Sequence, residues 1–113
     1  MRFELRQAGP ALVIEVREPR LDAAVAIRFK EVVREAMAHE GSPVILDLSQ
    51  VGFLDSSGLG AIVGIMKLLG ADRPLQIAGL TESVRKVFRL TRMDTVFTIH
   101  EQVPQTRPIS ATG

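Results

Sequence analysis

The sequence DSSGLG at residues 55–60 follows the apolar run VILDL at residues 44–48 and leads into the apolar segment 59–69. The run at 44–48 is typical of a strand that is covered on both faces. The segment 59–69 has the length and composition of a helix. Ser56 and Ser57 therefore lie where a loop turns into a helix. A serine at that point can cap the helix or present an exposed, reactive hydroxyl.

The rest of the chain alternates between strand and helix patterns. The order ββαβαβαβ predicts a single α/β domain over residues 1–100, with a mixed sheet and helices packed against it. Pro104, Pro108 and many small polar residues predict an extended or mobile tail at residues 101–113. The expected elements, in chain order, are strands at 2–7 and 11–16, a helix that Asp22 caps and Gly41-Ser42-Pro43 closes, a strand at 44–48, a helix at 57–70, a strand at 75–78, a helix capped by Thr81 and a strand at 96–99.

The composition argues against several classes of function. The chain has 113 residues and a net charge of +1, with no Cys, Trp or Tyr. The small charge and the shortage of aromatic side chains argue against nucleic-acid binding. The absence of Cys excludes disulfides, and the two histidines, His39 and His100, are far apart in the sequence, so no metal site is expected.

The location of the protein is also predicted from the sequence. No apolar run approaches the ~20 residues that a membrane-spanning helix needs. The N-terminus, MRFEL at residues 1–5, lacks the apolar region of a signal peptide. We therefore expect a cytoplasmic protein without membrane insertion.

The segment from Val44 to Gly70 resembles the bacterial anti-sigma factor antagonists, which are stand-alone STAS domains. The resemblance continues at Leu21-Asp22 and in VRKVFRLT at residues 84–91, so that it covers roughly residues 3–100. It implies a STAS-like fold. In this family a partner kinase phosphorylates the first serine after the aspartate, which is Ser56 here.

The serine pair has two interpretations. A single hydroxyl is enough to cap a helix, so one serine after Asp55 is free to point outward. The partial positive charge of a helix N-terminus can hold a phosphate. Together with the resemblance, this predicts Ser56 as the phosphorylation site and Ser57 as the cap. Asp22 matches the aspartate of the family's Leu-Asp pair, which the resemblance places close to the phosphorylated serine, and Asp22 can also cap the first helix.

The helix after the serines is apolar on almost every side, because Lys67 is the only charged side chain between Ser56 and Ala71. A surface helix normally has a polar face. Either the domain encloses this helix, or part of it is an exposed apolar surface for a partner. The spacing predicts an inner stripe of Leu59, Ile62, Val63, Met66 and Leu69. With the resemblance, the candidate partner-binding residues are Asp22, Asp55, Ser57, Gly58, Leu59, Gly60, Ile65 and Leu68.

Two stretches differ from the family pattern. Relatives often have Thr-Gly-Leu where this chain has Thr91-Arg92-Met93, so a glycine that would stop the third helix is missing. Most relatives have Gly-Glu before Leu-Asp, whereas this chain has Glu18-Pro19-Arg20. The third helix also carries a basic stripe, which is either a solvated face or a surface that steers an acidic partner. The stripe consists of Arg85, Lys86, Arg89 and Arg92.

Catalytic motifs are not found. The sequence before Ser56 forms no G-x-S-x-G elbow, and the glycines at 58, 60 and 64 have the wrong spacing for a dinucleotide-binding fingerprint. We therefore expect a protein that is not an enzyme and that needs no cofactor or metal of its own.

The resemblance implies a regulatory binding module. Its unphosphorylated form would bind an anti-sigma factor with serine-kinase activity and so release a sigma factor to direct transcription. Phosphorylation of Ser56, with ATP and Mg²⁺ brought by the kinase, would switch off binding, and a PP2C-type phosphatase would restore it. Two alternatives use the same domain: a STAS subunit of a lipid-transport ABC system, and a partner-switching regulator whose target is not a sigma factor. The sequence does not predict an oligomeric state.

Overall fold

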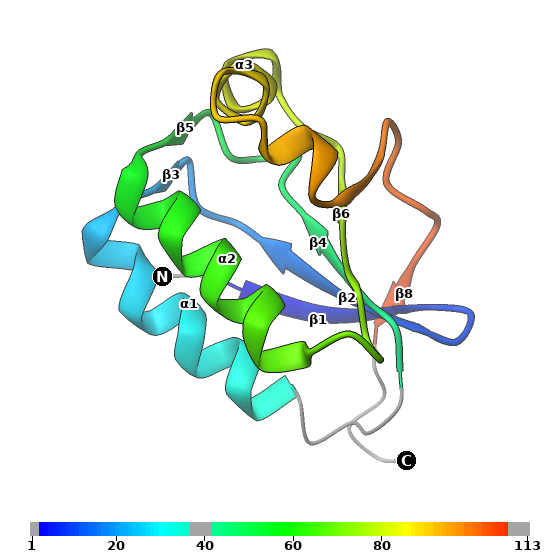
Figure 1. Cartoon of the computed structure of the whole chain (residues 1–113). Helices are drawn as coiled ribbons and strands as arrows, with labels where there is room; N and C mark the ends of the chain where they lie inside the picture. The colour runs from blue at the N-terminus through cyan, green and yellow to red at the C-terminus, as the bar shows by residue number, and fades with distance from the viewer. Residues whose placement is uncertain (1–2, 37–41, 109–113) are drawn as a thin grey trace.

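The computed structural model describes residues 3–36 and 42–108, and its central feature is a six-stranded mixed sheet (Figure 1). The strand order is β7-β6-β4-β2-β1-β8. β1 pairs with β2 and with β8 antiparallel, whereas β2, β4, β6 and β7 run parallel to one another. The strands are β1 (Phe3–Ala8), β2 (Ala11–Val16), β4 (Val44–Asp47), β6 (Leu75–Ala78), β7 (Thr98–His100) and β8 (Arg107–Pro108).

Two helices, α1 (Ala23–Ala36) and α2 (Ser56–Leu69), lie side by side against one face of this sheet (Figure 1). The third helix, α3 (Glu82–Leu90), lies at one end of the sheet beside β5 and is followed by the 3₁₀ turn η1 (Met93–Thr95). A separate two-stranded parallel sheet joins β3 (Arg20–Leu21) to β5 (Phe53–Leu54). This small sheet places the start of α1 next to the start of α2.

The alternation of side chains along β2 divides the core into two parts. Leu12, Ile14 and Val16 are buried against the helices, as part of the larger hydrophobic cluster. Ala11 and Val13 point to the other face of the sheet, where they form a smaller cluster with Ile45 and Ala78. The half-buried Val103, on the segment between β7 and β8, packs against this second cluster. Burial of one large aliphatic side chain contributes about 1.5–3 kcal/mol, so the larger cluster contributes most to stability.

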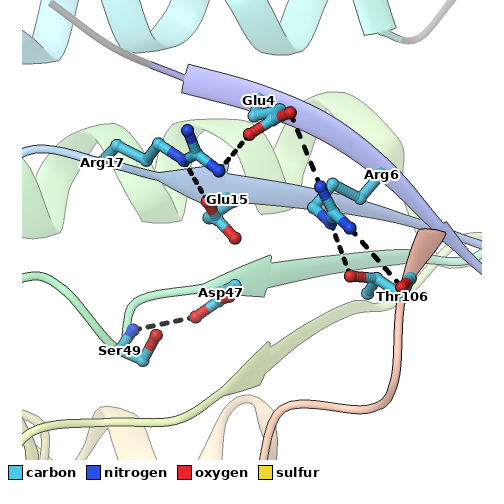
Figure 2. Close-up of polar contacts among 7 residues, drawn as sticks. All are labelled: Glu4, Arg6, Glu15, Arg17, Asp47, Ser49 and Thr106. Carbon is cyan, nitrogen blue, oxygen red and sulfur yellow. Dashed lines mark hydrogen bonds and ion pairs between the residues drawn. The ribbon is translucent and has the colours of Figure 1, made fainter. Parts of the chain in front are cut away.

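The second face of the sheet also carries a network of ion pairs, drawn in Figure 2. Arg17 pairs with both Glu4 and Glu15, and its hydrogen bond to Glu15, together with the charges of both glutamates, raises the pKa of Arg17. Arg6 Nη1 lies 3.5 Å from Glu4 Oε1, and Arg6 Nε donates to Thr106 Oγ1 at 2.6 Å. The network therefore ties the segment that leads into β8 to the edge of β1.

The order of the main predicted elements is confirmed. Asp22 caps α1, because its Oδ1 accepts hydrogen bonds from Ala24 N at 3.1 Å and Val25 N at 3.3 Å. The predicted closure of this helix at residues 41–43 falls partly on residues 37–41, which are outside the described part of the chain. The structure adds β3, β5, β8 and η1, which are too short to give a periodic signal.

Two details differ from the sequence-based expectations. The last predicted strand, at residues 96–99, is found at Thr98–His100, because η1 occupies the residues before it. Thr81 is at the N-cap position of α3, but its hydroxyl donates to Val51 O at 2.7 Å and does not cap the helix. Within the predicted tail at residues 101–113, residues 107–108 form a short strand on β1.

Arg92 occupies the position where relatives often have glycine, and its backbone is left-handed, with φ 61° and ψ 18°. This conformation costs an L-residue roughly 1–2 kcal/mol, whereas glycine adopts it freely but loses more entropy on folding. We therefore expect Arg92→Gly to raise the free energy of unfolding by about 0.5–1 kcal/mol, which corresponds to roughly 2–5 °C in the melting temperature. Thermal unfolding followed by circular dichroism measures this shift.

The matched control is Arg89→Gly, in the last turn of α3, where the backbone is helical and the side chain is exposed. Glycine there is expected to lower stability by about 1 kcal/mol. Equal effects of the two substitutions would contradict the assignment of backbone strain to Arg92.

Candidate functional site

The two serines, Ser56 and Ser57, are the first two residues of α2, and both are exposed. Asp55 precedes them in an extended conformation and caps the helix, because its Oδ1 accepts a hydrogen bond from Gly58 N at 2.9 Å. Neither serine hydroxyl makes a side-chain hydrogen bond to another residue that the structure describes. Both hydroxyls therefore remain available at a helix N-terminus.

The prediction that Ser57 caps this helix is wrong. The helix begins at Ser56, one residue earlier than expected, so Asp55 holds the N-cap position and Gly58 is the third helical residue. The carboxylate of Asp55 is a stronger acceptor than a hydroxyl because it is charged. It also interacts favourably with the partial positive charge of the helix start.

The two capping aspartates, Asp22 and Asp55, come from neighbouring strands. Leu21 and Leu54 are direct partners in the β3–β5 pairing, and Asp22 and Asp55 directly follow the ends of these two strands. Asp55 N also donates to Leu21 O at 3.5 Å. The N-termini of α1 and α2 therefore lie side by side, each with a half-buried carboxylate, and the exposed serines project from the second of them.

Gly58 is buried at this junction and permits the close approach of α2 to β3. A Cβ atom at residue 58 would overlap the carbonyl oxygen of Leu21 and lie 2.8 Å from Leu54 Cδ1. Gly60 differs, since it is exposed and a Cβ atom there would meet nothing within 4 Å. Of these two candidate partner-binding residues, Gly58 is required by the packing, whereas nothing in the described fold requires glycine at residue 60.

The sequence interpretation missed the pairing of Arg20 with Phe53 on the small sheet beside the serines. The guanidinium carbon of Arg20 lies 4.1 Å from the centre of the Phe53 ring, and Arg20 Nε is 3.4 Å from Asp22 Oδ2. Phe53 remains 40% exposed. No sequence signal indicated this contact, because β3 and β5 have two residues each and are far apart in the chain.

The inner face of α2 differs from the predicted stripe. Gly58, Ala61, Ile62, Ile65 and Leu69 are the buried residues, while Leu59, Val63 and Met66 are only half-buried. The prediction that Ile65 lies at a partner-binding surface is wrong, because its side chain is 0% exposed in the core. Leu68 is 48% exposed, as that prediction required. The sequence could not fix the rotation of the helix, because nearly all of its residues are apolar.

The outer side of α2 is largely exposed. Ser56, Gly60, Val63 and Lys67 follow one another at steps of four, three and four residues, which places them along one line of the helix surface. Of these, Val63 is half-buried and the others are exposed. Among the described residues no group of three His, Cys, Asp or Glu side chains could hold a metal ion. The site therefore offers hydroxyl and carboxylate groups beside a partly apolar surface.

The model of the STAS domain family matches residues 2–106. The chain belongs to this family. An anti-sigma-B factor antagonist from Staphylococcus epidermidis is 34% identical to it over 83 residues, which cover 72% of this chain and 76% of that protein. The predicted family and its α/β fold, with a mixed sheet and three helices, are confirmed.

Two solved structures share this STAS fold. An anti-sigma factor antagonist from Mycobacterium paratuberculosis superposes with a TM-score of 0.81 at 20% identity, over 90% of this chain and 86% of that one. The Bacillus cell fate determinant SpoIIAA, solved in its phosphorylated form, superposes with a TM-score of 0.63 at 22% identity, over 87% of this chain and 90% of that one. In the part of our chain that the structure describes, the helices are too short or too polar to cross a membrane.

Proposed function

We propose that this chain is an anti-sigma factor antagonist that a phosphorylation at Ser56 switches off. In its unmodified form it binds an anti-sigma factor that is also a serine kinase, and a sigma factor is released. The observation that carries the proposal is the exposed serine pair at the N-terminus of α2, outside the Asp55 cap. The name of the 34% identical relative supports the same class of target.

Binding and chemistry are divided between the two partners. This chain supplies the acceptor hydroxyl and the docking surface, which we place at Asp22, Asp55, Ser57, Leu59, Gly60 and Leu68, around the start and the outer side of α2. The kinase supplies ATP and Mg²⁺ and transfers the terminal phosphoryl group to Ser56 Oγ. A PP2C-type phosphatase removes the phosphate. Because the proposed kinase uses ATP and the sigma factor acts on transcription, phosphorylation and its reversal would take place in the cytoplasm. The role of this chain is to bind its partner, and it catalyses neither step.

The geometry explains how a phosphate would act as a switch. It adds a charge of about −1.5 to −2 next to the carboxylates of Asp55 and Asp22. In the free protein this charge faces water and the positive end of the α2 dipole, so it costs little. In the complex the same charge would be covered by the partner beside apolar residues of α2, where desolvation and like-charge repulsion oppose binding.

Ser56 is a better phosphate acceptor than Ser57 because it lies on the exposed, outer side of α2. It lies on the same line of α2 as Gly60 and Lys67, which are exposed. One turn after Ser57, α2 has the buried Ala61, and two turns after it Gly64 faces the Lys30 side chain of α1. A kinase that approaches the outer side of α2 therefore meets Ser56 first.

We expect Ser56→Ala to abolish phosphorylation by the cognate kinase and Ser57→Ala to leave most of it. Neither substitution removes the helix cap, since Asp55 provides it, so both variants should fold like the wild type. Mass spectrometry of kinase-treated protein locates the phosphate, and circular dichroism controls for folding. Phosphate found mainly on Ser57 would refute the assignment to Ser56, and no phosphate on either serine would refute the switch.

A further inference from the structure

A hollow of about 360 Å³ lies where the end of α2, the start of β6 and the edge strand β7 meet. Its walls are mostly apolar: Met66 from α2, Pro74 and Leu75 at the start of β6, and Val96 just before β7. Val96 remains 48% exposed on this surface. A water molecule takes up about 30 Å³ in the liquid, so the hollow has room for about a dozen heavy atoms. This is within the range of small-molecule sites.

Lys67 is the one charged side chain on the lining of this hollow. It forms no ion pair with any other residue that the structure describes. A lysine stem can lie along apolar walls while its ammonium group stays at the mouth. The hollow therefore combines an apolar interior with a single cation at its rim.

We propose that this hollow binds a small amphipathic carboxylate. An aliphatic chain of about eight carbons would lie against Met66, Leu75 and Val96, and the carboxylate would pair with the ammonium group of Lys67. The class of head group follows from the charge, because one lysine balances one negative charge. The class of tail follows from the walls, which offer apolar contact over most of the lining.

This site is separate from the serine site. Lys67 follows Ser56 by about three helical turns, which is roughly 16 Å along the axis of α2. The proposal depends neither on phosphorylation nor on an anti-sigma partner, so it can be tested on the isolated protein.

The test is a titration of the whole chain with octanoate, followed by the backbone amide shifts in NMR spectra. We expect saturable shifts centred on Gly70, Leu75 and Val96, with a dissociation constant near the millimolar range. Octanamide, which has the same tail without the charge, should bind at least fivefold more weakly. No saturable shifts with octanoate, or shifts centred outside the hollow, would overturn the proposal.

Matched variants test the role of the charge. Lys67→Gln should weaken octanoate at least fivefold and leave octanamide unchanged, whereas Lys86→Gln, on the exposed side of α3, should change neither. A second pair tests the position of the head group: Val96→Glu should weaken octanoate more than Val96→Gln does. Equal binding of octanoate to wild type and Lys67→Gln would overturn the proposed carboxylate site.

Discussion

Gly58→Ala is expected to lower the free energy of unfolding by about 3 kcal/mol, because the added methyl group has no space. Its carbon would overlap the carbonyl oxygen of Leu21 and lie 2.8 Å from Leu54 Cδ1. The first of these atoms belongs to the backbone, so relief requires β3 and α2 to separate. Overpacking of a core costs typically 1–3 kcal/mol and sometimes more, and here the Asp55 cap is disturbed as well. Urea denaturation measures the loss.

Two other glycines of α2 provide matched controls for this prediction. Gly60→Ala places its methyl group in open space and should raise stability by about 1 kcal/mol, as expected for an exposed helical position. Gly64→Ala brings the methyl group to an ordinary contact of 3.6 Å with Lys30 Cε, and should also be tolerated. If Gly58→Ala were as stable as the wild type, β3 would be free to retreat, and the close approach would not fix the site.

These glycines show how far the sequence predicts the site. The motif DSSGLG located the start of α2 to within one residue, because a carboxylate, small residues and an apolar segment follow one another there. The role of Gly58 could not be predicted, since its neighbour Leu21 lies on a two-residue strand that has no periodic signal. The observed cap, Asp55, lies two residues before the predicted cap, Ser57, which is within the usual uncertainty of one or two residues at helix ends.

The fold was predictable wherever polar and apolar residues recur with the period of a helix or a strand, so that one face is clearly apolar and the other polar. In α1 exposed charged residues such as Arg28 and Glu31 separate the buried Val25, Phe29 and Val33, which gives a clear helical pattern. In α2 this contrast is missing, and Ile65 was assigned to the wrong side of the helix. Contacts between distant residues, such as Arg20 with Phe53, become visible only when the chain is folded.

Ser56→Asp is expected to weaken binding to the anti-sigma partner by at least tenfold while the domain stays folded. Ser56 is exposed in the first turn of α2, where a negative charge is favoured by about 0.3–1 kcal/mol. The nearby carboxylates of Asp55 and Asp22 offset part of this gain. We therefore expect a melting temperature close to that of the wild type. The penalty arises in the complex, where the added carboxylate loses its hydration and faces like charges.

Calorimetric titration measures binding and a thermal melt of the same samples measures folding, so the two effects are separated. The control is Ser56→Asn, because Asn has nearly the same shape as Asp but carries no charge. If charge is the cause, the Asn variant binds almost like the wild type, and the difference between the Asp and Asn variants shrinks as salt is added, because screening acts on charge alone. Equal losses of affinity in the Asp and Asn variants would show that the partner requires the small size of the serine side chain. A large drop in melting temperature for both would show that Ser56 stabilises the helix start, although its hydroxyl makes no cap there. If the Asp variant bound with unchanged affinity, a negative charge at residue 56 would not weaken binding, and the electrostatic account of the switch would have to be abandoned.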